Sequence, residues 1–179
     1  MKKALIFDLD RVLFNTDFLK RIDKGYKKGE PFCLKIVKRI NWTEIEPQDL
    51  VYKDVYPKLN GWLKKGNKIY LFSQGDIRGQ RYKLKASGLN KFFSSKNSYI
   101  FSPPKAKKLK NIFQKIPPDL EIWYFDDKLE NLKTAKSING TIKTVLVWRN
   151  KKKDEKNHLE NILFKPDLII TSFREINKL

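Results

Sequence analysis

Two pairs of carboxylates lie where buried strands are expected to end. Asp8 and Asp10 follow the apolar residues ALIF in KALIFDLDRVLF, and Asp126 and Asp127 follow the aromatic segment WYF near the other end of the chain. A continuous apolar run predicts a strand that is buried on both faces, as in a parallel sheet. Because ligands of such sheets bind beyond the carboxyl ends of the strands, the two pairs predict a metal-dependent phosphate site.

The chemistry of this site follows from its carboxylates. Carboxylates that lie close together resist joint ionisation unless a cation is present, and oxygen ligands suit Mg²⁺. The acidic segments contain no histidine or cysteine, which disfavours zinc. One carboxylate can attack phosphorus to give an aspartyl-phosphate, and a second can protonate the leaving oxygen and then activate water. Ser73, which ends another expected strand in IYLFSQGD, would donate its hydroxyl to the phosphoryl oxygens.

Short strand signals alternate with helical stretches along the chain. The expected strands cover residues 3–8, 69–72, 99–101, 121–125, 144–148 and 167–171. The expected helices cover residues 47–64, 76–87, 104–115 and 128–138. This alternation indicates an α/β fold with a mainly parallel sheet.

Residues 15–46 interrupt the alternation. They carry apolar residues at helical spacing, but the segment is too short to hold a core alone. We expect a small helical cap over a core made of residues 1–14 and 47–179, where it would cover a site at the end of the first strand. A peripheral helix pair is the alternative.

Length and composition set further limits. The 179 residues suit one domain of ordinary size and leave room for a small insertion. The single cysteine, Cys33, rules out an intrachain disulfide and favours a reducing compartment. The apolar run near the N-terminus is too short for a signal peptide, and no segment approaches a membrane span. We therefore expect a soluble, cytoplasmic protein, of an oligomeric state that the sequence leaves open.

The charge of the chain is compatible with an anionic partner. A formal net charge of +19 at pH 7 suggests binding to nucleic acid. However, few of the 39 basic residues are arginine, the side chain that favours bidentate recognition of phosphate and bases. We favour a solvated, lysine-rich surface. A nucleic-acid-binding protein, or a phosphatase of polynucleotide ends, is the alternative.

The motifs closely resemble those of the haloacid dehalogenase (HAD) superfamily of Mg²⁺-dependent phosphohydrolases. FDLDRVLF is similar to the first motif, LFSQGD to the second, and FDDKLENLKTAKSING to the fourth. The resemblance extends from residue 3 to about residue 173. It implies a Rossmann-like core in which the first strand is central and is flanked by the strands that carry the other two motifs.

The resemblance implies a role for each acidic residue that matches a motif. Asp8 takes the place of the nucleophile and Asp10 that of the general acid and base. Asp127 takes the principal metal position, Asp126 the neighbouring one, and Asn131 a supporting position in the following turn. Mg²⁺ would be held by the carboxylates of Asp8, Asp127 and Asp126 together with the backbone carbonyl of Asp10.

The resemblance also implies the residues that bind the substrate phosphate. Ser73 takes the serine or threonine position of the second motif, and Gln74 follows it. The third motif is a lone lysine ahead of a helix. Lys105 in SPPKAKKL matches it best, with Lys107 and Lys108 as alternatives in the same stretch.

Two residues depart from the family pattern. Arg11 follows Asp10 where many members carry glycine or another small residue, so its guanidinium either contacts substrate phosphate or points to solvent. Phe125 stands before the fourth-motif acids where glycine is common, which suggests a tight hydrophobic contact. Neither departure removes a catalytic group.

The resemblance implies a phosphatase of a small phosphorylated metabolite or nucleotide. A dehalogenase is disfavoured, because that branch needs neither a metal nor the second carboxylate of the first motif. A phosphomutase stays open as an alternative, since it would share every core residue.

Overall fold

The structure is a computed structural model of the chain, and it describes residues 2–27, 34–102, 104–149 and 164–177. Cys33 lies outside the described residues. Within them, no helix combines the length and the apolar character that crossing a membrane requires.

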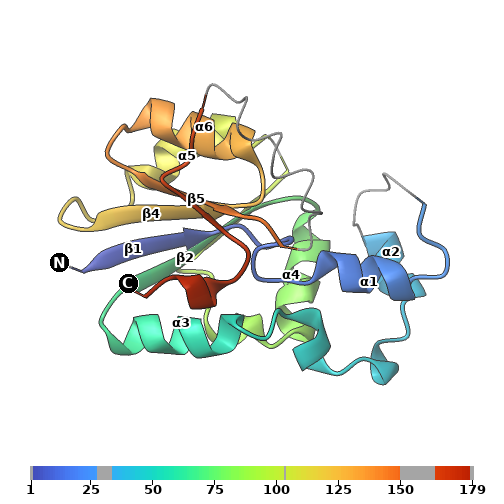
Figure 1. The fold of residues 1–179 in the computed structure, drawn as a ribbon. Helices are drawn as coiled ribbons and strands as arrows, with labels where there is room; N and C mark the ends of the chain where they lie inside the picture. The colour runs from blue at the N-terminus through green and yellow to red at the C-terminus, as the bar shows by residue number, and fades with distance from the viewer. Residues whose placement is uncertain (1, 28–33, 103, 150–163, 178–179) are drawn as a thin grey trace.

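A parallel sheet forms the centre of the molecule (Figure 1). Within the described ranges, six strands make up this sheet in the order β3-β2-β1-β4-β5-β6, and all paired neighbours run parallel. Their bounds are β1 (Lys3–Phe7), β2 (Lys68–Gln74), β3 (Ser98–Phe101), β4 (Glu121–Asp126), β5 (Lys143–Val147) and β6 (Leu168–Ile170). The predicted α/β fold is confirmed, and β2 and β4 flank β1 as the resemblance implies.

The apolar run before Asp8 forms a strand that is buried on both faces. All four residues from Ala4 to Phe7 are fully shielded from solvent, as expected for a central strand of a parallel sheet. The ring of Phe7 stacks on that of Phe125 in β4, with their centroids 4.7 Å apart. Phe125 is also fully buried and therefore fills the core beside the site, which is the hydrophobic contact that its position suggests.

Helices cover both faces of the sheet. Helices α3 (Val55–Lys64) and α4 (Ile77–Ala86) lie on one face, and α5 (Ala106–Phe113) and α6 (Leu129–Ile138) lie on the other (Figure 1). Each face has its own apolar cluster, one with Leu59 and Leu84 and the other with Leu109 and Leu132. Short 3-10 helices η3 (Leu89–Lys91) and η5 (Phe173–Glu175) complete the core.

The helix predicted for residues 47–64 is shorter than expected. The 3-10 helix η2 (Pro47–Leu50) starts at the predicted proline, but α3 begins only at Val55. Between them, Val51 is extended and forms an isolated bridge with Phe14. The prediction is wrong here because a buried contact with the loop after β1 holds this segment out of the helical conformation.

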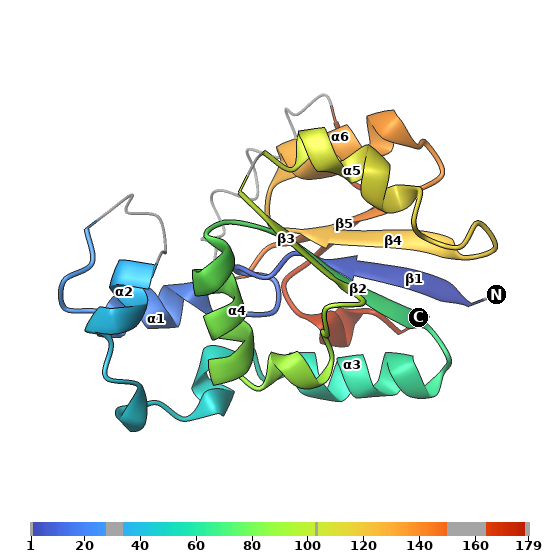
Figure 2. The same ribbon diagram turned by 180° about the vertical axis from the view of Figure 1, so that it is seen from behind.

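Residues of the predicted cap lie beyond the carboxyl ends of the strands (Figures 1 and 2). They form α1 (Thr16–Ile22), α2 (Leu34–Arg39) and the 3-10 helix η1 (Trp42–Glu44). Asn15 caps α1 through its side chain, and an ion pair of 2.6 Å joins Asp23 to Arg39 of α2. Because Leu19 and Ile36 belong to the same apolar cluster as the core, this segment packs directly on the core. Its division from the core at residues 15 and 46 stays a prediction.

Candidate active site

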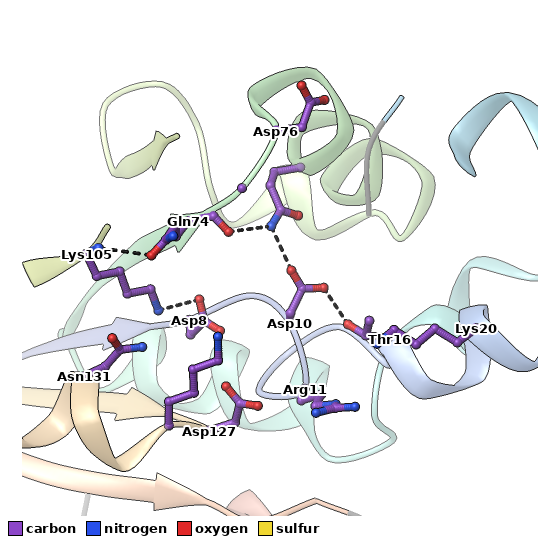
Figure 3. A pocket seen from close by; sticks show the side chains of 13 residues that line it. Asp8, Asp10, Arg11, Thr16, Lys20, Gln74, Asp76, Lys105, Asp127 and Asn131 are labelled. Carbon is purple, nitrogen blue, oxygen red and sulfur yellow. Dashed lines mark hydrogen bonds and ion pairs between the residues drawn. The ribbon is translucent and has the colours of Figure 1, made fainter. Parts of the chain in front are cut away.

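A polar cavity of about 500 Å³ opens where β1, β2 and β4 end (Figure 3). Its described lining is Asp8, Asp10, Arg11, Thr16, Lys20, Gln74, Gly75, Asp76, Gln80, Lys105, Asp127, Lys128 and Asn131. The cavity thus brings together residues from all three expected motif strands and from helix α1. No aromatic side chain occurs in this described lining.

The loop after β1 turns sharply to present its two carboxylates. The backbone N–H of Asp8 still pairs with Phe125 of β4 at 2.9 Å, and the loop then reverses at Arg11, which has φ of +61°. Only glycine adopts this left-handed region without steric cost, which is a physical reason for glycine at this position. The Arg11 guanidinium lines the cavity and bonds the carboxylate of Asp17 at 2.8 Å.

Lys105 lies at the floor of the site. Its ammonium group donates to Asp8 at 2.7 Å and to Asp126 at 2.6 Å, and it is 3% exposed. Lys107 and Lys108, the alternatives for the third motif, are exposed and are absent from the described cavity lining. The position of Lys105 just before α5 places it against the first-motif carboxylate (Figure 3).

Asp126 and Asp127 have different surroundings. Asp126 is fully buried, and besides Lys105 its carboxylate accepts bonds from the Tyr124 hydroxyl at 2.6 Å and from the Asn131 amide at 3.0 and 3.1 Å. The carboxylate of Asp127 instead faces the cavity. Asp126 therefore holds Lys105 and Asn131 in place, whereas Asp127 leaves its carboxylate open to the cavity.

The carboxylates fit a divalent cation. Oxygens of Asp8, Asp126 and Asp127 lie within 4.8 Å of one another. Burial, together with the charges of Asp126 and Asp127, raises the pKa of Asp8 to about 8 despite the opposing charge of Lys105. Burial and the charge of Asp126 raise the pKa of Asp127 to about 6. A cation such as Mg²⁺ would relieve this repulsion and suits an all-oxygen ligand set.

Asp10 is bonded through both of its oxygens. Thr16 donates its hydroxyl to Oδ1 at 2.5 Å, Lys83 donates to the same oxygen at 2.5 Å, and Gln80 donates to Oδ2 at 2.8 Å. Burial alone would raise the pKa of Asp10, but the charge of Lys83 and these hydrogen bonds outweigh it and lower the pKa to about 2. Asp10 is therefore ionised at neutral pH, which suits a base, whereas action as an acid requires prior uptake of a proton.

The end of β2 contributes Gln74 rather than Ser73 to the described cavity lining. Ser73 is fully buried, and its hydroxyl finds no hydrogen-bond partner within the described residues. Adjacent side chains on a strand point to opposite faces, and Gln74 is the one that faces the cavity, where its side chain accepts a bond from the Lys105 backbone at 3.1 Å. The roles of both residues in phosphate binding stay predictions.

Sequence reasoning missed the residues around Asp10. Thr16, Gln80 and Lys83 did not stand out, although Gln80 and Lys83 are three apart in the segment before Gly88 and therefore share one face of a helix. The missing information was that this face is buried and turned toward the loop after β1. One usable signal was the position of both residues just after the second motif.

Comparisons with known proteins bear on the sequence and on the overall fold. No family model matches the chain. Enolase-phosphatase E1 of Danio rerio is 27% identical over 134 residues, which are 70% of this chain and 48% of that protein. The chain thus spans about half the length of this curated relative.

Solved structures extend the likeness over nearly the whole chain. A haloacid dehalogenase-like hydrolase of Burkholderia xenovorans has a TM-score of 0.68 and 17% identity, with 96% of this chain and 93% of that chain covered. The HAD-hydrolase YfnB of Bacillus subtilis, described as bound to magnesium, has a TM-score of 0.67 and 15% identity, with 97% and 96% covered. The chain has the HAD-like fold, which confirms the resemblance at the level of fold.

Proposed function

We propose that this chain, which has the HAD hydrolase fold, is a Mg²⁺-dependent phosphatase that cleaves a phosphomonoester of a small metabolite or nucleotide. The observation that carries the proposal is the position of Asp8. Its carboxylate lies at the end of the central strand, bonded to Lys105 at 2.7 Å and close to Asp127, and it faces the polar cavity. A carboxylate in this setting is suited to attack a bound phosphoryl group.

Asp8 and Asp127 would hold the metal with the backbone carbonyl of Asp10. The ion would neutralise the phosphoryl oxygens and so allow an anionic nucleophile to approach an anionic substrate. The magnesium reported for YfnB supports Mg²⁺ as the ion.

The remaining steps belong to residues of the chain. Asp10 first takes up a proton from solvent. An oxygen of Asp8 then forms a bond to phosphorus while the bond to the ester oxygen breaks, and Asp10 gives its proton to that leaving oxygen. Water then attacks the phosphorus of the aspartyl-phosphate, loses a proton to Asp10 and releases inorganic phosphate and free Asp8. Lys105 stabilises the negative charge of Asp8 and of the phosphoryl group throughout.

The cavity favours a small substrate over a polynucleotide. Its volume of about 500 Å³ is in the range of sites for small molecules. Single-stranded nucleic acids are typically bound by stacking of bases on aromatic side chains, and the described lining contains none. The enolase-phosphatase relative is also named for a phosphatase activity. A phosphomutase shares the same core residues and stays the second candidate.

Turnover measurements test this function. Purified protein would be assayed for phosphate release on sugar phosphates, nucleotides and 3′-phosphorylated oligonucleotides, with Mg²⁺ and after exhaustive chelation, with D8N as the inactive control. We expect Mg²⁺-dependent release from small phosphomonoesters. Full activity after chelation would overturn the metal assignment, and selective hydrolysis of oligonucleotide ends would favour the polynucleotide alternative. Transfer of phosphate to a second position of a sugar phosphate would indicate a mutase.

A further inference from the structure

We propose that Lys83 is a positioning residue which, together with Gln80, fixes the carboxylate of Asp10 for its acid–base steps. The inference rests on the proposed function, since Asp10 has these steps only in such a reaction. It gives a catalytic supporting role to two residues of helix α4, which lie outside the predicted motifs.

The geometry is that of a two-point clamp on one carboxylate. Lys83 and Gln80 reach different oxygens of Asp10, at 2.5 and 2.8 Å. The two residues are three apart on α4 and therefore lie on one face of the helix. With Thr16 donating from α1 on the other side, the carboxylate is fixed in both position and plane.

The burial of the clamp is asymmetric. The side chain of Lys83 is 1% exposed, whereas that of Asp10 is 29% exposed and lines the cavity. A lysine is rarely buried this completely unless it is paired, and a buried ion pair is often no more stabilising than apolar residues of similar volume. We therefore infer that the ion pair serves to orient the carboxylate of Asp10 in the cavity and not to stabilise the fold.

The turn before α4 is shaped to admit the clamp. A Cβ atom on Gly75 would lie 2.7 Å from the amide nitrogen of Gln80, which is closer than real Cβ contacts. That same nitrogen also donates to the carbonyl of Gln74 at 3.2 Å, so Gln80 is tied to the end of β2 as well as to Asp10. The helix that follows the second motif is thus coupled to the carboxylate of the first motif.

The test compares K83M with wild type on two kinds of substrate. Methionine keeps the length and the apolar packing of the lysine but removes its ammonium group. Because general acid–base catalysis is worth about 10²–10⁴-fold, we expect kcat for alkyl phosphates to fall by about 10- to 100-fold. The burst of p-nitrophenolate from p-nitrophenyl phosphate should change by less than about 3-fold, since this group departs without protonation.

Two controls separate positioning from a structural effect. K85M changes an exposed lysine of the same helix and should leave both rates unchanged. In a D10N background K83M should have no further effect on turnover, because residues that act through one group are not additive. A general loss of folding would instead lower the rates on both substrates equally, and its effect would add to that of D10N.

The outcomes distinguish this inference from the proposed function. Wild-type protein that hydrolyses no phosphomonoester would contradict the proposed function itself. Active wild type with an unchanged ratio of alkyl to p-nitrophenyl rates in K83M would overturn the role of Lys83 alone. Should K83M not fold, Q80A would carry the test, since it removes the second donor and leaves the buried lysine paired. The same selective loss in Q80A would support the clamp, and an unchanged ratio would refute it.

Discussion

Residues at the floor of the site balance opposing charges. Lys105 is shared between two carboxylates, and the pKa of Lys105 is raised because these charges outweigh the effect of burial. One ammonium group cannot neutralise three neighbouring carboxylates, so burial and the remaining repulsion raise the pKa values of Asp8 and Asp127. The protein alone therefore leaves a net negative site, which is the condition for binding a divalent cation.

Replacing each carboxylate of the first motif should block a different step of the reaction. In D8N the attacking anion is lost, so turnover should disappear while substrate still binds. In D10N the nucleophile remains, so p-nitrophenyl phosphate should form a phosphoenzyme that hydrolyses slowly for want of a base, by about 10²–10⁴-fold. Single-turnover kinetics with intact-mass detection measures both steps. A covalent phosphate mapped to a residue other than Asp8 would refute the mechanism.

Replacement of Asp127 should stabilise the metal-free protein. A carboxyl whose folded pKa is raised costs stability once the pH exceeds its ordinary value, and the pKa of Asp127 is raised to about 6 by burial and by Asp126. At neutral pH D127N should therefore gain about 3 kcal/mol without metal, at about 1.4 kcal/mol per pKa unit. Mg²⁺ should raise the melting temperature of wild type but not that of D127N.

Thermal unfolding with and without Mg²⁺ provides this measurement. D119N, which changes an exposed aspartate outside the described lining of the cavity, should respond to Mg²⁺ as wild type does. Equal stabilisation of D127N and wild type by Mg²⁺ would argue against Asp127 as a ligand.

At the scale of elements, the junction between β2 and α4 sets the geometry of the site. Gln74 ends the strand, Gly75 makes the turn, and Asp76 caps the helix by accepting a bond from the Gly79 backbone at 2.7 Å. One turn further on, Gln80 reaches Asp10. The direction of α4 thus decides whether its buried polar face meets the loop after β1.

The glycine of this junction should be needed for both catalysis and stability, because its φ of +157° strains any residue that carries a Cβ atom. In G75A the new methyl group would displace the amide of Gln80, so kcat for alkyl phosphates should fall by about 10-fold, part of the acid–base contribution. G61A is a matched control, since nothing lies within 4 Å of a Cβ there and alanine stabilises a helix by about 0.5–1 kcal/mol. Steady-state kinetics and thermal unfolding of both variants test this prediction. A wild-type kcat in G75A would show that Gly75 is not needed to place the amide of Gln80.

The strand ends were predictable because one pattern encodes both burial and chemistry. An apolar run that stops at Asp8, or at Asp126, marks a buried strand and its functional end together. The late start of α3 had no such signal. It depends on the bridge between Phe14 and Val51, which joins segments far apart in sequence. Lys83 was hidden for the same reason, because its burial depends on how α4 packs and not on its neighbours in the chain.

At the scale of the molecule, one buried ion pair joins four distant segments. Arg149, which follows β5, bonds the carboxylate of Asp54 at 2.8 and 2.9 Å and the carbonyl of Val12 at 3.1 Å. The same carboxylate accepts bonds from the side chain of Ser172 and the backbone of Phe173. These bonds therefore fix the loop after β1, the start of α3, the end of β5 and the C-terminal region to one another.

This ion pair should contribute a distinct part of the acid sensitivity of the fold. Burial would raise the pKa of Asp54, but its bonds and the charge of Arg149 outweigh burial and lower it. A lowered pKa gives stability that is complete above the ordinary value of about 3.9 and is lost as the pH falls through the folded value.

Replacing Asp54 tests this contribution. D54N keeps the shape but leaves Arg149 buried without a counter-charge, so the free energy of unfolding should fall by about 3–5 kcal/mol at neutral pH. The deficit relative to wild type should shrink below about pH 4, where Asp54 of wild type becomes protonated on unfolding. Denaturant unfolding across this pH range measures the difference, with D49N, an exposed aspartate of η2, as the matched control. A deficit that is the same at every pH would show that lost packing, and not lost charge, is the cause.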